Sequence, residues 1–146
     1  MKEKILVSAC LMGAPCRYDG TAKASPAALR LAERYEIVRV CPEALGGLPT
    51  PREPSELRGE RVFMRSGRDV TGEYRRGAER ALELCRKYDI RTAVLKERSP
   101  SCGLGEIFDG TFRQVRIPGS GVTARLLAEN GIRVLGESEI AAELLR

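Results

Sequence analysis

The sequence contains no histidine. Histidine is the side chain that most often acts as a general base near neutral pH, and its imidazole is the commonest nitrogen ligand for metal ions. Its absence excludes every mechanism and every metal site that depends on an imidazole group. Any catalytic or metal chemistry of this chain must therefore use thiolates, carboxylates, hydroxyls and backbone groups.

The sequence also lacks a long apolar segment. No run approaches the ~18 apolar residues that a membrane span needs, and Ile5–Val7, after the charged start Met1–Lys4, is too short for a signal-peptide core. We therefore expect a cytoplasmic protein with no membrane partner, in a reducing compartment where stable disulfides are rare. Five cysteines in such a protein indicate metal binding, catalysis or burial rather than a disulfide framework.

Length and charge add two further expectations. The chain has 146 residues and no internal repeat, low-complexity tract or linker, which predicts a single domain over residues 1–146. Its net charge of +5 comes from 25 basic and 20 acidic residues without a long basic run, so the charge does not predict a nucleic-acid partner. We expect a monomer or a small homo-oligomer.

Short β-branched runs alternate with amphipathic segments along the chain. The expected strands are Ile5–Ser8, Ile37–Val40, Thr92–Lys96 and Ile132–Leu135, with a short edge strand at Arg61–Arg65. The expected helices run from Pro26 to about Arg34, from Val122 to Glu129 and from Ser138 to Arg146, and a longer one covers Thr71–Tyr88. This alternation predicts an α/β fold with a single open, mostly parallel, Rossmann-like sheet and helices on both faces. Ser120 is expected to cap the helix from Val122 to Glu129, and Asp109-Gly110 to form a hairpin turn.

Four of the five cysteines lie in loops rich in glycine and proline, and three of these loops follow expected strands. These four are Cys10, Cys16, Cys41 and Cys102. Ligands of open parallel sheets bind in the crevice outside the carboxyl ends of the strands, so we expect these thiols to share one site. Cys85 differs because it falls on the apolar face of the long helix, where cysteine acts as a small core residue.

The spacing of the cysteines narrows the choice of metal only slightly. Zinc sites are commonly built on cysteines with two to four residues between them, whereas Cys10 and Cys16 have five residues between them. A dithiol redox centre would show a Cys-x-x-Cys motif, which is also missing. An iron–sulfur cluster is larger and can be held from widely spaced loops. The spacing favours such a cluster over zinc but leaves both open.

Five segments form a more specific pattern: Ile5–Leu11, Cys16–Gly20, Cys41–Glu43 with Gly46–Arg52, Lys96–Gly103 and Asp109–Phe112. In the same order, and over essentially the whole chain, they resemble the 2-thiouracil desulfurase family, a bacterial family long known only as a domain of unknown function. The resemblance implies a [4Fe–4S] cluster held by three cysteines, which leaves one iron open. It also implies a non-redox reaction in which a small thiolated nucleobase, such as 2-thiouracil, loses its sulfur as sulfide.

Four loop cysteines compete for the three ligand positions that the resemblance implies. Cys10, Cys16 and Cys102 are the expected ligands. Cys41 is either an alternative ligand or a nearby thiol that receives sulfur. The motifs do not distinguish these two roles.

The remaining implied roles are catalytic and substrate-binding. Hydrolysis of a carbon–sulfur bond needs a proton acceptor, and without histidine a carboxylate is the natural choice. Glu43, matched through Cys-Pro-Glu, is the expected general acid/base, and Ser99 and Ser101 are expected to orient water or substrate. Charged residues of the same motifs are expected to contact substrate or to form salt bridges: Arg17, Asp19 and Arg98, and also Arg52.

Two other functions fit the same cysteines. The chain could belong to sulfur trafficking or tRNA thiolation, with its basic surface on RNA, or it could be a structural zinc or cluster module without catalysis. Sulfide release from a free thiobase would support the desulfurase reading, and RNA binding that is lost at moderate salt would support the second.

Overall fold

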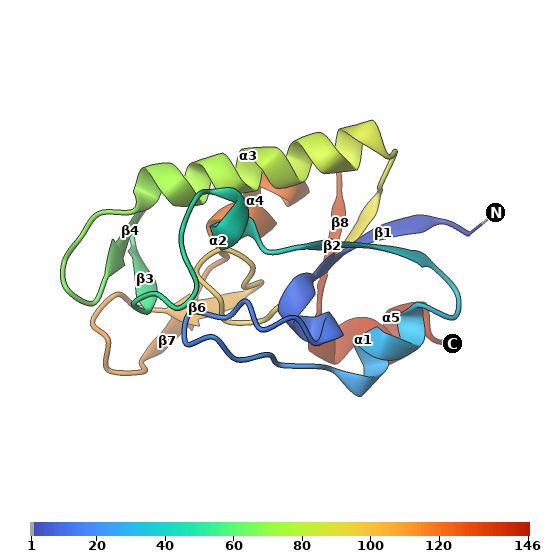
Figure 1. Ribbon diagram of the computed structural model, residues 1–146, viewed down its shortest axis with the longest axis horizontal. Helices are drawn as coiled ribbons and strands as arrows, with labels where there is room; N and C mark the ends of the chain where they lie inside the picture. The colour runs from blue at the N-terminus through green and yellow to red at the C-terminus, as the bar shows by residue number, and fades with distance from the viewer. Residues whose placement is uncertain (1) are drawn as a thin grey trace.

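Four parallel strands form the central sheet of the computed structural model, which describes residues 2–146. They are β1 (Lys4–Ser8), β2 (Glu36–Val40), β5 (Thr92–Leu95) and β8 (Arg133–Gly136), in the order β2-β1-β5-β8 (Figure 1). The two central strands, β1 and β5, are almost entirely buried. Continuous apolar runs of this kind are typical of parallel strands that are covered on both faces. The predicted α/β fold with a mostly parallel sheet is confirmed.

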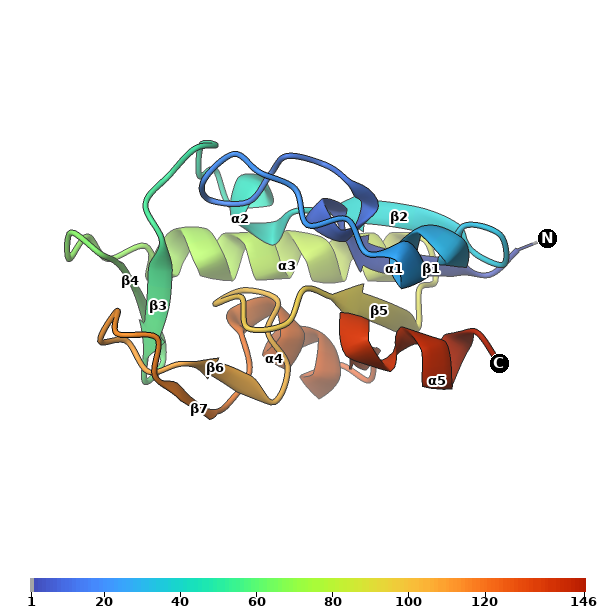
Figure 2. The same ribbon diagram turned by 90° about the horizontal axis from the view of Figure 1, so that it is seen from below.

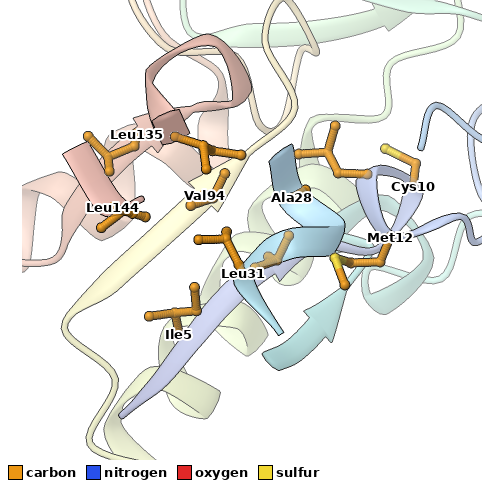
Figure 3. Close-up of a cluster of buried hydrophobic side chains, with 11 residues drawn as sticks. Ile5, Cys10, Met12, Ala28, Leu31, Val94, Leu135 and Leu144 are labelled. Carbon is orange, nitrogen blue, oxygen red and sulfur yellow. The ribbon is translucent and has the colours of Figure 1, made fainter. Parts of the chain in front are cut away.

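Helices cover both faces of the sheet, and alternate residues of β1 point to opposite sides. On one face, Ile5 and Val7 pack with side chains of α1 (Pro26–Leu31) and α5 (Ile140–Leu144) (Figure 3). On the other face, Leu6 packs with side chains of α3 (Thr71–Lys87) and α4 (Val122–Glu129). Figure 2 shows α3 and α5 on opposite sides of β5. The sheet is therefore buried between two apolar clusters.

Two hairpins lie at the end of the molecule away from both termini, as Figures 1 and 2 show. They pair β3 (Ser55–Arg58) with β4 (Arg61–Met64), and β6 (Glu106–Phe108) with β7 (Arg116–Pro118). Three short helical segments complete the fold: η1 (Ala9–Met12), α2 (Pro42–Leu45) and η2 (Glu137–Glu139). No helix within residues 2–146 has both the length and the apolar character of a membrane span.

Two local expectations were wrong. Gly121, not Ser120, is the N-cap of α4, and the Ser120 hydroxyl instead accepts a hydrogen bond from the backbone of Gly105 at 3.3 Å. Asp109-Gly110 does not form a tight hairpin turn, because β7 begins only at Arg116 and residues 109–115 form a longer loop. Side-chain carboxylates bind the backbone amides of this loop, so the chain there does not need a partner strand.

Helices α2 and α3 contact each other through a pair of glycines. A Cβ atom on Gly77 would lie 1.9 Å from the backbone oxygen of Pro42, and one on Gly46 would lie 1.9 Å from that of Glu73. These distances leave no room for any side chain. The glycines therefore seat α2, and with it Glu43, directly on the backbone of α3.

Gly77→Ala should destabilise the protein by about 1–3 kcal/mol, because the new methyl group forces α2 away from α3. Helix propensity alone predicts the opposite effect, because alanine normally stabilises a helix by up to about 1 kcal/mol relative to glycine. Urea unfolding followed by circular dichroism measures the change. Gly72→Ala in the same helix is the matched control, because a Cβ there meets nothing within 4 Å, and it should be neutral or stabilising. Equal effects of the two substitutions would contradict the close contact.

Candidate active site

A cavity of about 450 Å³ opens at the carboxyl ends of β1, β2 and β5. Four cysteines line it: Cys10, Cys16, Cys41 and Cys102. The fifth, Cys85, is 1% exposed in the core beneath α3, and burial raises the pKa of its thiol to about 11. The structure thus brings together the four loop cysteines and separates them from the core cysteine, as the sequence predicted.

The loop after β1 folds back on itself and places two of these thiols side by side. The carbonyl of Cys10 accepts hydrogen bonds from the amides of Gly13 and Lys23, at 3.2 and 3.1 Å. This turn returns the chain so that the Cys16 thiol reaches Cys10. Their interaction lowers the pKa of Cys10 and raises the pKa of Cys16. Shifts in opposite directions are expected of two titrating groups that are held close together.

The other two cysteines reach the cavity from β2 and β5. Cys41 directly follows Val40, which is paired with Ser8 at the end of β1. The loops that carry Cys41 and Cys10 therefore begin side by side at the same end of the sheet. Its thiol donates a hydrogen bond to the carbonyl of Cys16 at 3.7 Å. Interaction with Cys16, followed by burial, raises the pKa of Cys41 strongly.

Ser8 joins Cys102 to the end of β1. Its hydroxyl accepts a hydrogen bond from the backbone N–H of Lys96 at 2.9 Å and donates one to the sulfur of Cys102 at 3.3 Å. The Ser101 hydroxyl lies 3.6 Å from the same sulfur, and its single proton can go either to this sulfur or to Glu43 Oε2. Cys102 is 4% exposed, and burial is the main cause that raises its pKa to about 12. A thiolate that is buried to this extent is stable only with a cation or a metal beside it.

The donor set fits an iron–sulfur cluster better than a single metal ion. Within residues 2–146, no three Cys, Asp or Glu side chains come close enough to hold one ion. The four thiols are nevertheless gathered around one cavity. A cluster of several irons presents its coordination positions over a wider span than one ion, and its usual ligands are cysteine thiolates. Separated thiols around an open cavity match that requirement.

Glu43 lies at the start of α2 beside the thiols, and two polar side chains bind its carboxylate. One carboxylate oxygen, Oε1, accepts a hydrogen bond from Arg52 Nε at 2.8 Å, and the other, Oε2, accepts one from the Ser101 hydroxyl at 3.3 Å. The Ser99 hydroxyl lies 3.0 Å from that of Ser101. Ser99, Ser101 and Glu43 therefore form a continuous chain of proton-carrying groups along the cavity wall.

Arg52 holds this carboxylate and the Cys16 loop together. Its side chain is 2% exposed and, besides Glu43, it donates to the carbonyl of Cys16 at 2.9 Å. It also donates to Thr50 Oγ1 at 2.8 Å and to the carbonyl of Pro49 at 3.1 Å. Burial alone would lower the pKa of the guanidinium, but the Glu43 carboxylate more than offsets this and the pKa is raised.

Sequence reasoning anticipated Arg52 as a salt-bridged residue but missed Tyr74. Tyr74 is 1% exposed on α3 and also lines the cavity, and burial together with the nearby Glu43 carboxylate keeps its pKa well above 10. Its spacing puts it on the same buried face of α3 as Ala78 and Cys85, which suits its ring. The hydroxyl group could have indicated a place near the site, since a buried tyrosine normally has a polar partner.

The expected substrate-binding residues divide into two groups. Arg17 and Arg98 line the cavity. Asp19 does not line it: its carboxylate accepts hydrogen bonds from the amide and hydroxyl of Thr21, at 3.0 and 2.6 Å. These bonds make Asp19 an exposed turn residue that shapes the loop after Cys16.

The fold and the site define an α/β protein with thiols, hydroxyls and a buried-arginine–carboxylate pair around one cavity at the sheet edge. Residues 5–139 match the family model described as 2-thiouracil desulfurase, and the chain belongs to this family. It is similar to a solved structure named [4Fe-4S]-dependent thiouracil desulfidase TudS, with 51% identity, a TM-score of 0.90 and coverage of 99% of this chain and 97% of that one. It is also 44% identical over 146 residues to the uncharacterized protein YbbK of Bacillus subtilis (strain 168), covering 93% of this chain and 97% of that protein.

Arg52→Gln should cost about 3 kcal/mol of folding stability, because it leaves the partly buried Glu43 carboxylate without its counter-charge. Urea unfolding of Arg52→Gln, Glu43→Gln and the double variant tests this as a double-mutant cycle. The double variant should lose less than the sum of the two single losses. Arg125→Gln, which breaks the exposed pair with Glu129, is the control and should leave the unfolding midpoint unchanged. Additive losses for Arg52 and Glu43 would argue against their coupling.

Proposed function

We propose that this protein is an iron–sulfur-dependent desulfidase that hydrolyses the carbon–sulfur bond of a small thiolated pyrimidine such as 2-thiouracil. The observation that carries the proposal is the meeting of four thiols from distant loops around one cavity that also holds Glu43. Family membership and the name of the similar solved structure support the same chemistry. The cavity, at about 450 Å³, falls in the range that suits a small-molecule ligand.

Cys10, Cys16 and Cys102 are the proposed ligands of a [4Fe–4S] cluster. Three protein ligands leave one iron open, and this iron supplies a Lewis acid with affinity for the soft sulfur of a thiocarbonyl. Cys41 is the proposed fourth, non-ligating thiol. Its hydrogen bond to the carbonyl of Cys16 suits a protonated thiol that packs beside the site.

The protein's own groups handle the proton. In the overall reaction, thiouracil and water give uracil and hydrogen sulfide, with no change in oxidation state. Glu43 accepts a proton from the attacking water at Oε2, the oxygen that Arg52 does not bind. Ser99 and Ser101 orient the water along the cavity wall, since each hydroxyl can both donate and accept. Arg52 keeps the carboxylate in place throughout.

Arg17 and Arg98 are the proposed substrate contacts, because both line the cavity and carry donors suited to a carbonyl oxygen. Asp19 would act indirectly, by holding the turn that follows Cys16 and Arg17. Lys96, which also lines the cavity, adds positive charge near the thiols and forms an ion pair with Glu137 at 3.1 Å. These cations favour a site that carries anionic thiolates.

Sulfide release from free 2-thiouracil by anaerobically purified protein tests the proposed reaction. We expect one uracil for each sulfide and no requirement for an external reductant or oxidant. Transfer of sulfur only to a protein or an RNA would instead support a sulfur-trafficking role. A protein that holds iron but releases no sulfide would support a structural module.

Single cysteine variants test the proposed ligands. Cys10→Ala, Cys16→Ala and Cys102→Ala should each lose most of the bound iron and its visible absorption, whereas Cys41→Ala should retain them. Iron and acid-labile sulfide per chain, measured after anaerobic reconstitution, give the result. Cys85→Ala is the matched control, since this thiol lies in the core. Iron loss in Cys41→Ala with retention in one of the other three would reassign the ligand set.

Glu43→Gln should lower kcat by about 10²–10⁴-fold, the usual contribution of general acid–base catalysis. The iron content should stay that of the wild type, because an amide preserves the shape of the side chain. Steady-state sulfide release at saturating 2-thiouracil measures the change. Glu79→Gln, on the exposed face of α3, should behave as wild type. Near-normal kcat in Glu43→Gln would rule out its proton-transfer role.

A further inference from the structure

Part of the cavity wall comes from the loop between β6 and β7, residues 109–115, at the far end of the molecule from the termini (Figure 2). Phe112 and Gln114 of this loop line the cavity, as does Phe108 at the end of β6. Two of the chain's three phenylalanines therefore face the same cavity as the thiols. None of the groups assigned to cluster binding or proton transfer lies on this loop.

The backbone of this loop is strained at two of the residues that line the cavity. Within residues 2–146, four residues other than glycine have positive φ angles: Asp89, Arg98, Phe112 and Gln114. The last three line the cavity. Phe112 has a φ of 58° and Gln114 a φ of 60°, a region in which glycine is at ease and a bulky side chain is a true exception. Strain of this kind concentrates at ligand-binding sites.

Several side chains hold the loop in this strained form. Glu56 is buried, and its Oε1 accepts hydrogen bonds from the amides of Gly110 and Phe112, at 3.0 and 3.1 Å. Arg58 Nε donates to the carbonyl of Gly110 at 2.9 Å. The guanidinium of Arg65 lies 5.7 Å from the centre of the Phe112 ring. These contacts hold the backbone of the loop and the Phe112 ring in defined places.

We propose that this loop recognises the pyrimidine ring of the substrate, with Phe112 stacking on the ring and Gln114 hydrogen-bonding its edge. This inference rests on the proposed function and deepens it. Aromatic side chains stack on the flat face of any base. The glutamine amide offers an acceptor oxygen and two N–H donors, which complement a ring N–H beside a carbonyl oxygen. If only the path of the backbone mattered, glycine would serve at both positions without strain.

The test uses the cluster-loaded protein and two measurements. KM and kcat for 2-thiouracil come from sulfide release, and the affinity for uracil, the product without sulfur, comes from calorimetry. Gln114→Gly keeps the favourable backbone and removes the amide; Phe112→Leu removes the aromatic face. Each should raise KM and the Kd for uracil by about tenfold, the scale expected for one hydrogen bond or one stacked base, with kcat and iron content close to wild type.

Specificity gives a second readout. The wild type should discriminate against 2-thiouracil methylated at the ring nitrogen between the thiocarbonyl and the carbonyl, and Gln114→Gly should lose that discrimination. Val115→Ala is the matched control, because Val115 is in the same loop, is 44% exposed and is not among the residues that line the cavity. It should match the wild type in every measurement.

The outcomes separate this inference from the proposed function. A wild type that binds uracil but releases no sulfide would overturn the proposed function, and the calorimetric comparison of variants would still test the loop. Unchanged KM and Kd in both Gln114→Gly and Phe112→Leu, or equal effects in Val115→Ala, would overturn the recognition role. A wild type that binds neither pyrimidine would overturn it as well.

Discussion

The hydrogen bonds of Ser8 connect the two loops on which the arrangement of thiols depends. Ser8 ends the central strand β1, accepts from the backbone of Lys96 after β5, and donates to the sulfur of Cys102. Because β1 pairs in parallel with both β2 and β5, the chains that leave these three strands emerge side by side. This pairing is the main reason that cysteines separated by up to about ninety residues of sequence meet there.

A second set of contacts places a carboxylate beside those thiols and keeps it from moving. The glycine contact between α2 and α3 seats Glu43, and the buried Arg52 side chain joins its carboxylate to the Cys16 carbonyl. Burying an ion pair costs desolvation, and the cost is offset here because Arg52 satisfies four acceptors at once. These contacts give the Glu43 carboxylate a fixed position beside the thiols.

The strands of the sheet were predictable because apolar, β-branched runs with flanking helices have few alternatives to a parallel sheet. Of the hairpin strands β3 and β4, only β4 was predicted. The sequence of β3, Ser55–Arg58, is largely polar, although Ser55 and Glu56 are buried in the structure. The loop at residues 109–115 was mistaken for a tight turn. Its conformation depends on Glu56, more than fifty residues earlier, and no local pattern reports such a contact.

Residue types and motifs by themselves determined the chemistry available to this protein: thiols, hydroxyls and carboxylates without imidazole, on loops that follow strands. Tertiary structure alone decided which of these groups meet. It brought Arg52 to Glu43 and set the buried Tyr74 close to them. The physical reason is that strand order and helix contact set distances between remote residues, whereas sequence spacing sets distances only within one turn or one strand.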